Sequence, residues 1–487
     1  MATETPQSPP TAPTRAPRTG VPSISYSITV RLEVPAGGSA ISSLTTCVEA
    51  AGGVVTALDV TASEHDRLRI DVTCAASDTA HADEIVERLR GIEGVSVHKV
   101  SDRTFLMHLG GTIAMQTKHP IRNRDDLSMV YTPGVARVYQ AIAANPEDAR
   151  RLTVKRNSVA VVTDGSAVLG LGNIGPAAAL PVMEGKSALF KRFAGIDAWP
   201  LCLDTQDTDT IVEVVRAVSP GFAGINLEDI SAPRCFEIER RLREILDIPV
   251  FHDDQHGTAI VVLAALTNAL RVVGKQLSGV RVVLSGAGAA GTAILRLLLE
   301  AGVRDVVVAD VEGVIHRDRP GLHESLEWVA QRTNEARLTG SLHDAMTGAD
   351  VFIGVSAPNV IDADDVARMA PGGIVFALAN PQPEIDPGEA RRHAAVVATG
   401  RSDYPNQINN VLAFPGVFRG LLDASAHTID DTLLVAAAHA VSSVVAPEEL
   451  NANYIIPSVF NENVHTAVAA AVRAAAERSP AVPTSDV

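Results

Sequence analysis

The feature that most constrains the fold is a glycine-rich segment, Gly286–Gly291, placed between a strand and a helix. The segment Arg281–Ser285, with three apolar residues at its centre, predicts the strand, and Thr292–Glu300 has the pattern of an amphipathic helix. The next predicted strand, Arg304–Asp310, ends on an acidic residue. Together these features are typical of a Rossmann-type domain that binds a dinucleotide. A tight strand-to-helix turn without any ligand is the alternative.

Each glycine of this segment has a physical reason. Gly286 permits the tight turn, Gly288 lets the backbone approach a pyrophosphate, and Gly291 lets the helix pack close to the strand. The helix N-terminus offers unpaired N–H groups and a partial positive charge to the phosphates. Asp310 would accept hydrogen bonds from a ribose diol and would repel a 2′-phosphate, which favours NAD over NADP.

Residues 22–102 predict a separate, smaller domain with the order strand, helix, strand, strand, helix, strand. The six segments are Tyr26–Val34, Ala40–Ala51, Val54–Ala62, Leu68–Ala75, Thr79–Gly91 and Val95–Val100. This order is the ferredoxin-like split unit. It resembles the ACT domain, a small-ligand sensor often fused ahead of metabolic enzymes, with the loop at 35–38 where that family places its ligand. A domain that only supports dimerisation is the alternative.

The composition excludes several classes of protein. The chain has 487 residues, of which 46% are hydrophobic and 20% charged, so two or three globular domains are expected. Its net charge is −16 without a basic block, which argues against nucleic-acid binding. The four cysteines have no CxxC spacing and predict reduced thiols. Residues 1–21 predict a disordered arm, and no long apolar run is present, so we expect a soluble cytoplasmic protein.

Two acidic pairs, Glu228–Asp229 and Asp253–Asp254, each follow a short apolar strand. In a parallel sheet the carboxyl ends of the strands line the crevice where ligands bind. Converging carboxylates suit a hard cation such as Mg²⁺ or Mn²⁺, which prefers oxygen ligands. One pair alone could equally be solvated surface, but two pairs at strand ends favour a metal. His252 and His256 lack an HExxH arrangement, so a supporting role is expected for them.

Lys186 and Tyr131 are candidate acid–base groups. Lys186 follows a glycine-rich loop at 170–175, and a nearby bound cation could lower its pKa from about 10.4 toward neutrality. The usual fate of a lysine is a solvated surface. Tyr131 is one of only five tyrosines and lies in a Thr-Pro-Gly loop, either as a packed anchor or as a proton donor.

These segments together resemble a bacterial malic enzyme with an N-terminal ACT-like domain. The resemblance covers roughly Arg103 to Glu477 and rests on motifs that stand in the order of that family. They are Tyr131–Ala136, Val162–Gly165, Gly170–Asn173, Leu180–Lys186, Glu228–Asp229, Asp253–Thr258, Gly286–Gly291, Asn380–Pro381 and Asn409–Val411. It implies a catalytic domain at 103–257, a Rossmann domain at 258–420, and C-terminal helices at 421–487 that pack on the catalytic part.

The resemblance implies oxidative decarboxylation of malate to pyruvate and CO₂ with reduction of NAD, dependent on Mg²⁺ or Mn²⁺. It implies that Lys186 is the general base, held by Asp253, and that Tyr131 is the general acid. The implied metal ligands are Glu228, Asp229 and Asp254. Asn380 and Asn410 would contact the substrate. The expected cofactor-binding residues are Gly286, Gly288, Ala289, Ala290, Gly291, Asp310 and Asn380.

One position departs from the family pattern, and several alternatives stay open. Many larger malic enzymes carry an arginine after the Asp-Gly pair to grip a malate carboxylate, whereas this chain has Ser166 and Ala167. Arg304 or Arg317 could still accommodate the extra phosphate of NADP. A malolactic enzyme, which releases lactate, and a non-catalytic metabolite sensor are the competing functions. The family also implies a homodimer or higher homo-oligomer, and the ACT-like domain suggests a small-molecule effector.

Overall fold

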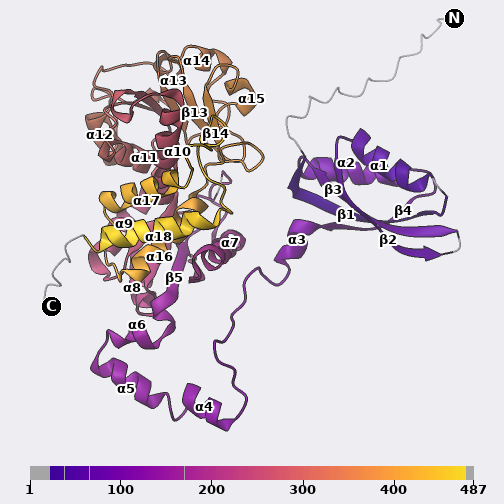
Figure 1. Ribbon diagram of the computed structural model, residues 1–487, viewed down its shortest axis with the longest axis horizontal. Helices are drawn as coiled ribbons and strands as arrows, with labels where there is room; N and C mark the ends of the chain where they lie inside the picture. Colours follow the sequence, from indigo (N-terminus) through magenta and orange to yellow (C-terminus); the bar gives the residue numbers. More distant parts are fainter. Residues whose placement is uncertain (1–21, 38, 65, 169, 479–487) are drawn as a thin grey trace, which may run out of the picture. The chain divides into compact units, whose positions relative to one another are not determined.

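The computed structural model describes residues 22–478 except positions 38, 65 and 169. The N-terminal segment 1–21, which the sequence predicts to be disordered, therefore lies outside the described residues. The chain forms two compact units, Met1–Thr112 and Ile113–Val487 (Figure 1). The first contains β1 (Ser23–Pro35), α1 (Ala40–Ala50), β2 (Val54–Glu64), β3 (Arg67–Ala76), α2 (Thr79–Arg90), β4 (Ser96–Asp102) and α3 (Arg103–His108). The predicted order of its strands and helices is confirmed.

The N-terminal unit is an antiparallel sheet with strand order β2-β3-β1-β4 and two helices on one face. Strand β1 alternates buried and more exposed positions, as expected for a half-buried strand. Its inward side chains meet those of both helices in one core, which includes Val30, Leu32, Val34, Leu44, Val48, Ile85 and Leu89.

The second unit begins its core with a four-stranded parallel sheet of order β6-β5-β7-β8. The strands are β5 (Ser158–Thr163), β6 (Asp197–Cys202), β7 (Gly224–Leu227) and β8 (Val250–His252). The accompanying helices are α7 (Pro176–Ala194), α8 (Thr208–Val218) and α9 (Arg234–Ile245), with short turns η1 (Val154–Asn157), η2 (Ser219–Gly221) and η3 (Asp253–Gly257). Every residue of β5 and β7 is buried, as is typical of parallel strands covered on both faces.

A six-stranded sheet of order β11-β10-β9-β12-β13-β14 forms the Rossmann-type half, and all its pairs are parallel except β10 with β11. Its strands are β9 (Arg281–Ser285), β10 (Asp305–Asp310), β11 (Gly313–Val314), β12 (Val351–Gly354), β13 (Ile374–Ala377) and β14 (Val396–Thr399). Its helices and turns are α11 (Ala289–Glu300), α12 (Glu324–Arg332), α13 (Leu342–Ala345), α14 (Ala363–Ala367), α15 (Pro387–Ala390), η4 (Leu277–Gly279) and η5 (Asn410–Leu412).

Helix α10 (Thr258–Val273) connects the two sheets through the core. With the preceding turn it forms the stretch Asp253–Val273, which is long and apolar enough to cross a membrane. However, 72% of its most apolar window is buried inside the protein, as in the core helix of a globular domain.

The C-terminal helices α16 (Phe414–Asp423), α17 (Asp431–Ser443) and α18 (Glu462–Ala476) pack back onto the catalytic half, since α16 contacts α7 and α17 contacts α10. Gly416 and Gly420 allow this close packing, because a Cβ atom at either position would lie 2.7 Å from Val468 or Val472 of α18. The predicted boundary at residue 420 falls inside α16.

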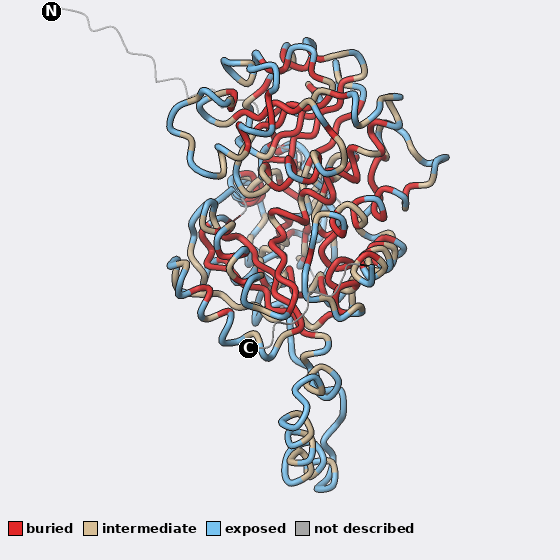
Figure 2. The backbone as a smooth tube through the Cα atoms, turned by 90° about the vertical axis from the view of Figure 1, so that its left-hand side faces the viewer, coloured by how far each residue is buried: buried red, intermediate tan, exposed pale blue. Residues whose placement is uncertain are grey.

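The segment 113–153, which we call the arm, differs from the rest of this unit. Its helices α4 (Arg124–Val130), α5 (Ala136–Ala144) and α6 (Asp148–Leu152) contain no buried residue. Figure 2 shows the arm in the colours of exposed and intermediate positions, in contrast to the buried sheets. It nevertheless carries large exposed apolar side chains, namely Ile113, Met115, Ile121, Leu127, Met129, Val130, Tyr131, Tyr139 and Leu152.

Candidate active site

Two strand ends of the parallel sheet build the site. Strand β7 runs directly into Glu228 and Asp229, and β8 runs into the π-helical turn η3, which we call the carboxylate turn. The turn carries Asp253 and Asp254 and leads into α10. Gly257 at its end is required by space, because a Cβ atom there would lie 1.9 Å from Asp253 Oδ1.

The structure brings Glu228, Asp229 and Asp254 together, with one oxygen from each within 4.8 Å of the others. The backbone N–H of Asp229 donates to Asp254 Oδ2 at 2.8 Å, which fixes one strand end against the other. Asp229 has a positive φ of 53°, a conformation that a non-glycine residue adopts at a cost. Such strain is typical of positions where a side chain must be aimed precisely.

The charges of this cluster are unfavourable without a cation. Burial raises the pKa of Glu228 well above its ordinary value. Burial and then the charge of Asp254 raise the pKa of Asp229 to about 7. Asp229 Oδ2 is buried and has no hydrogen-bond partner among the described residues. Three converging carboxylates with one orphaned oxygen therefore fit a hard divalent cation.

Lys186 is held beside these carboxylates. Its Nζ lies 2.5 Å from Asp253 Oδ2 and 2.9 Å from Glu228 Oε1, and 4.3 Å above the centre of the Phe414 ring. Asn410 Nδ2 donates to the same Asp253 oxygen at 2.5 Å. The structure thus brings Lys186, Asp253 and Asn410 into one hydrogen-bonded group.

The pKa of Lys186 is raised in the protein without a metal. Burial favours the neutral amine, but the charges of Asp253 and Glu228 outweigh burial and favour the ammonium ion. The direction is opposite to the one expected beside a bound cation. Its cause is that the lysine has two carboxylate ion-pair partners, Asp253 and then Glu228, which also belongs to the cluster of three.

The structure does not bring Tyr131 to this group. Tyr131 ends helix α4 of the arm and is 67% exposed. Asn380 is also exposed and lies against the glycine-rich loop instead, since a Cβ atom at Gly170 would be 2.3 Å from the Asn380 carbonyl oxygen. The sequence motifs identified both residues but not their surroundings.

The glycine-rich segment of the Rossmann-type half has the predicted geometry. A Cβ atom at Gly286 would lie 2.7 Å from the Val355 carbonyl oxygen, and one at Gly291 would lie 1.9 Å from the carbonyl oxygen of Gly286. A Cβ atom at Gly288 would meet nothing within 4 Å, so there is open space just before α11 begins at Ala289. These residues fit a pyrophosphate at the N-terminus of α11.

Three charged residues near the site were missed by sequence reasoning. Arg319 forms two hydrogen bonds to Asp310, of 2.9 and 2.8 Å, whereas the predicted Arg317 donates to the Gln331 carbonyl. Arg234 Nη2 lies 3.0 Å from Ser166 Oγ, at the position where the family arginine is missing. Glu239 of α9 contacts the carboxylate turn. All three meet partners distant in sequence or across irregular loops, so no local pattern marks them.

The comparison with protein families decides the relationship. The family model for the malic enzyme N-terminal domain matches residues 110–243, and the model for the malic enzyme NAD-binding domain matches residues 255–477. The chain belongs to the malic enzyme family.

Several members of this family are similar over most of their length. The NAD-dependent malic enzyme of Geobacillus stearothermophilus is 57% identical over 452 residues, which are 93% of this chain and 95% of that protein. The bifunctional malic/malolactic enzyme of Bacillus subtilis is 52% identical, covering 79% of this chain and 92% of that protein. The crystal structure of the NAD-dependent malic enzyme of Thermotoga maritima has a TM-score of 0.74 and 47% identity, covering 77% of this chain and 99% of that one.

Proposed function

We propose that this protein is an NAD-dependent malic enzyme, which oxidises malate at C2 and decarboxylates the product to pyruvate. The observation that carries this proposal is the buried Lys186, held by Asp253 and Glu228 beside three converging carboxylates in a malic enzyme fold. A structural ion pair would not require four acids and a lysine to share one site at two strand ends.

We propose Glu228, Asp229 and Asp254 as the ligands of Mg²⁺ or Mn²⁺. The mutual distances, the orphaned Asp229 oxygen and the raised pKa of Asp229 support this assignment. When bound there, the cation would polarise the C2 oxygen of malate and stabilise the charge that develops as CO₂ leaves.

Lys186 is the proposed general base. Its Nζ would accept the proton of the C2 hydroxyl group as hydride leaves C2, and NAD, when bound, would take up that hydride. Asp253 and Asn410 orient the amine, since Asp253 Oδ2 accepts hydrogen bonds from both. Lys186 must be neutral to act, so catalysis requires that the charge of its carboxylate partners be balanced by a cation.

We propose that the protein is a homodimer in which the arm of one copy completes the site of the other. The arm helices have 7, 9 and 5 residues and bury none of them, which is too short for stability in isolation. Their exposed apolar side chains suit a second copy of the same chain. Tyr131, the proposed general acid that protonates C3 of the enolate, would then act in the partner's site.

NAD is the proposed dinucleotide, bound by Gly286, Gly288, Ala289, Ala290 and Gly291 with Asp310 at the adenosine ribose. The carboxylate at the end of β10 supports this preference, although Arg319 neutralises part of its charge. Asn380 and Asn410 are the proposed substrate contacts. NADP-dependent relatives exist, including the enzyme of Halomonas elongata at 45% identity over 76% of this chain.

For the N-terminal unit we propose an ACT-like role with a small-molecule effector. The similarity to the Geobacillus enzyme supports a shared role, because its 452 matched residues exceed the 375 residues of Ile113–Val487 and so extend into this unit. We also propose a cytoplasmic location. The malolactic reaction is the second candidate, favoured by the name of the Bacillus subtilis relative.

A coupled assay tests the function. Malate, Mn²⁺ and either NAD or NADP are mixed with the protein, and absorbance at 340 nm is followed beside assays for pyruvate and lactate. The proposal expects reduced NAD and pyruvate in equal amounts, and no reaction with EDTA. Lactate without free NADH would establish the malolactic reaction, and the absence of any product would contradict both activities.

A further inference from the structure

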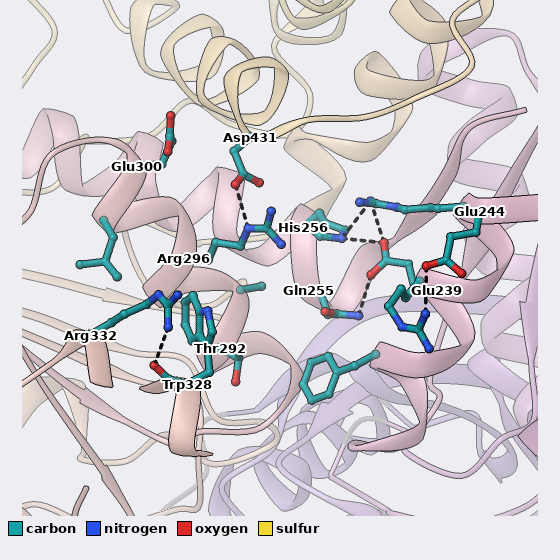
Figure 3. A pocket seen from close by; sticks show the side chains of 15 residues that line it. Glu239, Glu244, Gln255, His256, Thr292, Arg296, Glu300, Trp328, Arg332 and Asp431 are labelled. Carbon is teal, nitrogen blue, oxygen red and sulfur yellow. Dashed lines mark hydrogen bonds and ion pairs between the residues drawn. The ribbon is translucent and has the colours of Figure 1, made fainter. Parts of the chain in front are cut away.

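The carboxylate turn presents its residues to two sides. Asp253 contacts Lys186, and Asp254 lies in the cluster with Glu228 and Asp229. The next two residues, Gln255 and His256, instead face a cavity of about 850 Å³ that Glu239 also lines (Figure 3). The aspartates that serve the reaction and the residues that fix the turn are therefore adjacent in the chain.

Glu239, on helix α9, contacts the two residues of the carboxylate turn that face the cavity, Gln255 and His256. Its Oε2 accepts a hydrogen bond from Gln255 Nε2 at 3.2 Å, and its Oε1 accepts one from His256 Nε2 at 2.6 Å (Figure 3). Arg243, one helical turn later, lies 2.8 Å from the same Oε1. The Glu239 side chain is only 8% exposed.

The contacts are strong enough to constrain the turn. Burial opposes ionisation of Glu239, but His256 and Arg243 outweigh it and lower the pKa of Glu239 to about 2. The group is therefore a carboxylate at any working pH, and hydrogen bonds to an ionised acceptor are about twice as strong as neutral ones. The two residues that follow Asp254 are thus tied to a helix that carries no member of the metal cluster.

We propose that Glu239 is a positioning residue that sets the metal affinity of the site. It fixes the carboxylate turn through Gln255 and His256, on the side away from the metal cluster. It would touch neither metal nor substrate, and it acts through the backbone that joins Gln255 and His256 to Asp253 and Asp254. Loss of its charge frees the turn to rotate and spreads the three oxygens. This inference rests on the proposed metal ligands.

The test compares Glu239→Gln with Glu244→Gln in the full chain. Both variants remove one carboxylate from α9, but the Glu244 side chain is 58% exposed and pairs with Arg240 of the same helix. Mn²⁺ is titrated without malate or NAD, and free Mn²⁺ is read by electron paramagnetic resonance. We expect Glu239→Gln to raise the Mn²⁺ Kd about 10- to 100-fold. The Kd of Glu244→Gln and the NAD affinity of both variants should equal those of the wild type.

The outcomes separate this inference from the proposed function. A folded Glu239→Gln protein with the wild-type Mn²⁺ Kd overturns it, as does lower thermal stability without a change in Kd. If Glu239→Gln does not fold, Gln255→Leu removes only the 3.2 Å hydrogen bond and should raise the Kd in the same direction. An unchanged Kd in Gln255→Leu would then overturn the inference. A wild-type protein that binds no Mn²⁺ contradicts the proposed metal site itself.

Discussion

The Lys186 site and the arm that carries Tyr131 are built in opposite ways. Lys186 is 7% exposed and is fixed by two carboxylates and an aromatic ring from three other elements. Tyr131 is 67% exposed on a segment whose helices bury nothing. A single chain thus assembles the charged half of the site but leaves the Tyr131 side chain exposed to solvent.

This difference shows what each half depends on. A buried ammonium ion such as that of Lys186 needs charge partners, because an unpaired buried charge costs several kcal/mol, and Asp253 and Glu228 of the same chain supply them. Exposed apolar side chains on the arm cost less free energy than an unpaired buried charge. The single chain can therefore leave them uncovered until a partner surface binds. The two halves should therefore respond differently to substitution, to pH and to mixing of chains.

The largest effect is expected for Lys186→Ala. Without the base, kcat should fall about 10³- to 10⁴-fold, while NAD still binds, since the glycine-rich segment is not touched. Lys191→Ala on the same helix is the matched control, because Lys191 is 64% exposed and pairs with Asp197. The measurement is kcat from NADH formation with NAD affinity by calorimetry. Near-normal turnover would show that another group takes the proton.

Tyr131→Phe should lower kcat about 10²-fold without changing Mn²⁺ or NAD binding, because only a proton donor is lost. Tyr139→Phe is the control on the same arm, at 58% exposure. Mixing Lys186→Ala with Tyr131→Phe chains should restore about a quarter of wild-type activity, since a mixed twofold dimer has one intact site.

The mixing experiment distinguishes a tyrosine that acts in the partner's site from one that acts in its own chain. If subunits exchange and no activity returns, the tyrosine acts within its own chain and the arm must fold back onto the same unit. If Tyr131→Phe alone retains full activity, the arm supplies no proton donor at all. Subunit exchange is verified independently by mass spectrometry of differently tagged chains.

The buried half was the more predictable from sequence. Runs of valine and isoleucine mark strands covered on both faces, and acids directly after them must meet at the carboxyl edge of a parallel sheet. This reasoning placed Glu228, Asp229 and Asp254 at one edge, where the structure has them. It could not place Tyr131, because a motif in a loop says nothing about which surface covers the loop.

Asp229→Asn should change the pH dependence of stability. The folded pKa of Asp229 is raised from 3.8 to about 7, so its contribution to stability is full below pH 3.8 and is lost as pH rises through 7. In EDTA, Asp229→Asn should therefore be more stable than wild type by about 2–4 kcal/mol at pH 8, and equally stable near pH 4. Urea unfolding at several pH values measures this difference.

A substitution of an acidic residue on the arm should not make the free energy of unfolding depend on pH in this way. Asp125 on α4 is exposed, and Asp125→Asn should change the free energy of unfolding by less than about 0.5 kcal/mol at every pH.

Adding Mn²⁺ should stabilise the wild type but not Asp229→Asn, because only a ligand that binds the native state stabilises it. Equal stability of wild type and Asp229→Asn at pH 8 would contradict the pKa of Asp229 that burial and the charge of Asp254 raise.

The cofactor preference illustrates a further limit of sequence reasoning. Asp310 was predicted from its place at the end of a strand, but its partner was not. Arg319 reaches Asp310 only because the two-residue strand β11 folds back on β10. Such a reversal depends on backbone geometry in a loop, and neither periodicity nor motif spacing encodes it.

The smallest effect is expected for Arg319→Leu, which removes the cation beside Asp310. The freed carboxylate would repel a 2′-phosphate more strongly, so the ratio of kcat/KM for NAD over NADP should rise about tenfold, or about 1.4 kcal/mol. Arg317→Leu, whose guanidinium donates to a backbone carbonyl instead, is the control. Because Asp310 and Arg319 belong to one chain, the change should be the same at every protein concentration, whereas the contribution of Tyr131 should disappear on dilution to monomers. A fall in the ratio for Arg319→Leu would mean that Arg319 only orients Asp310 toward the ribose.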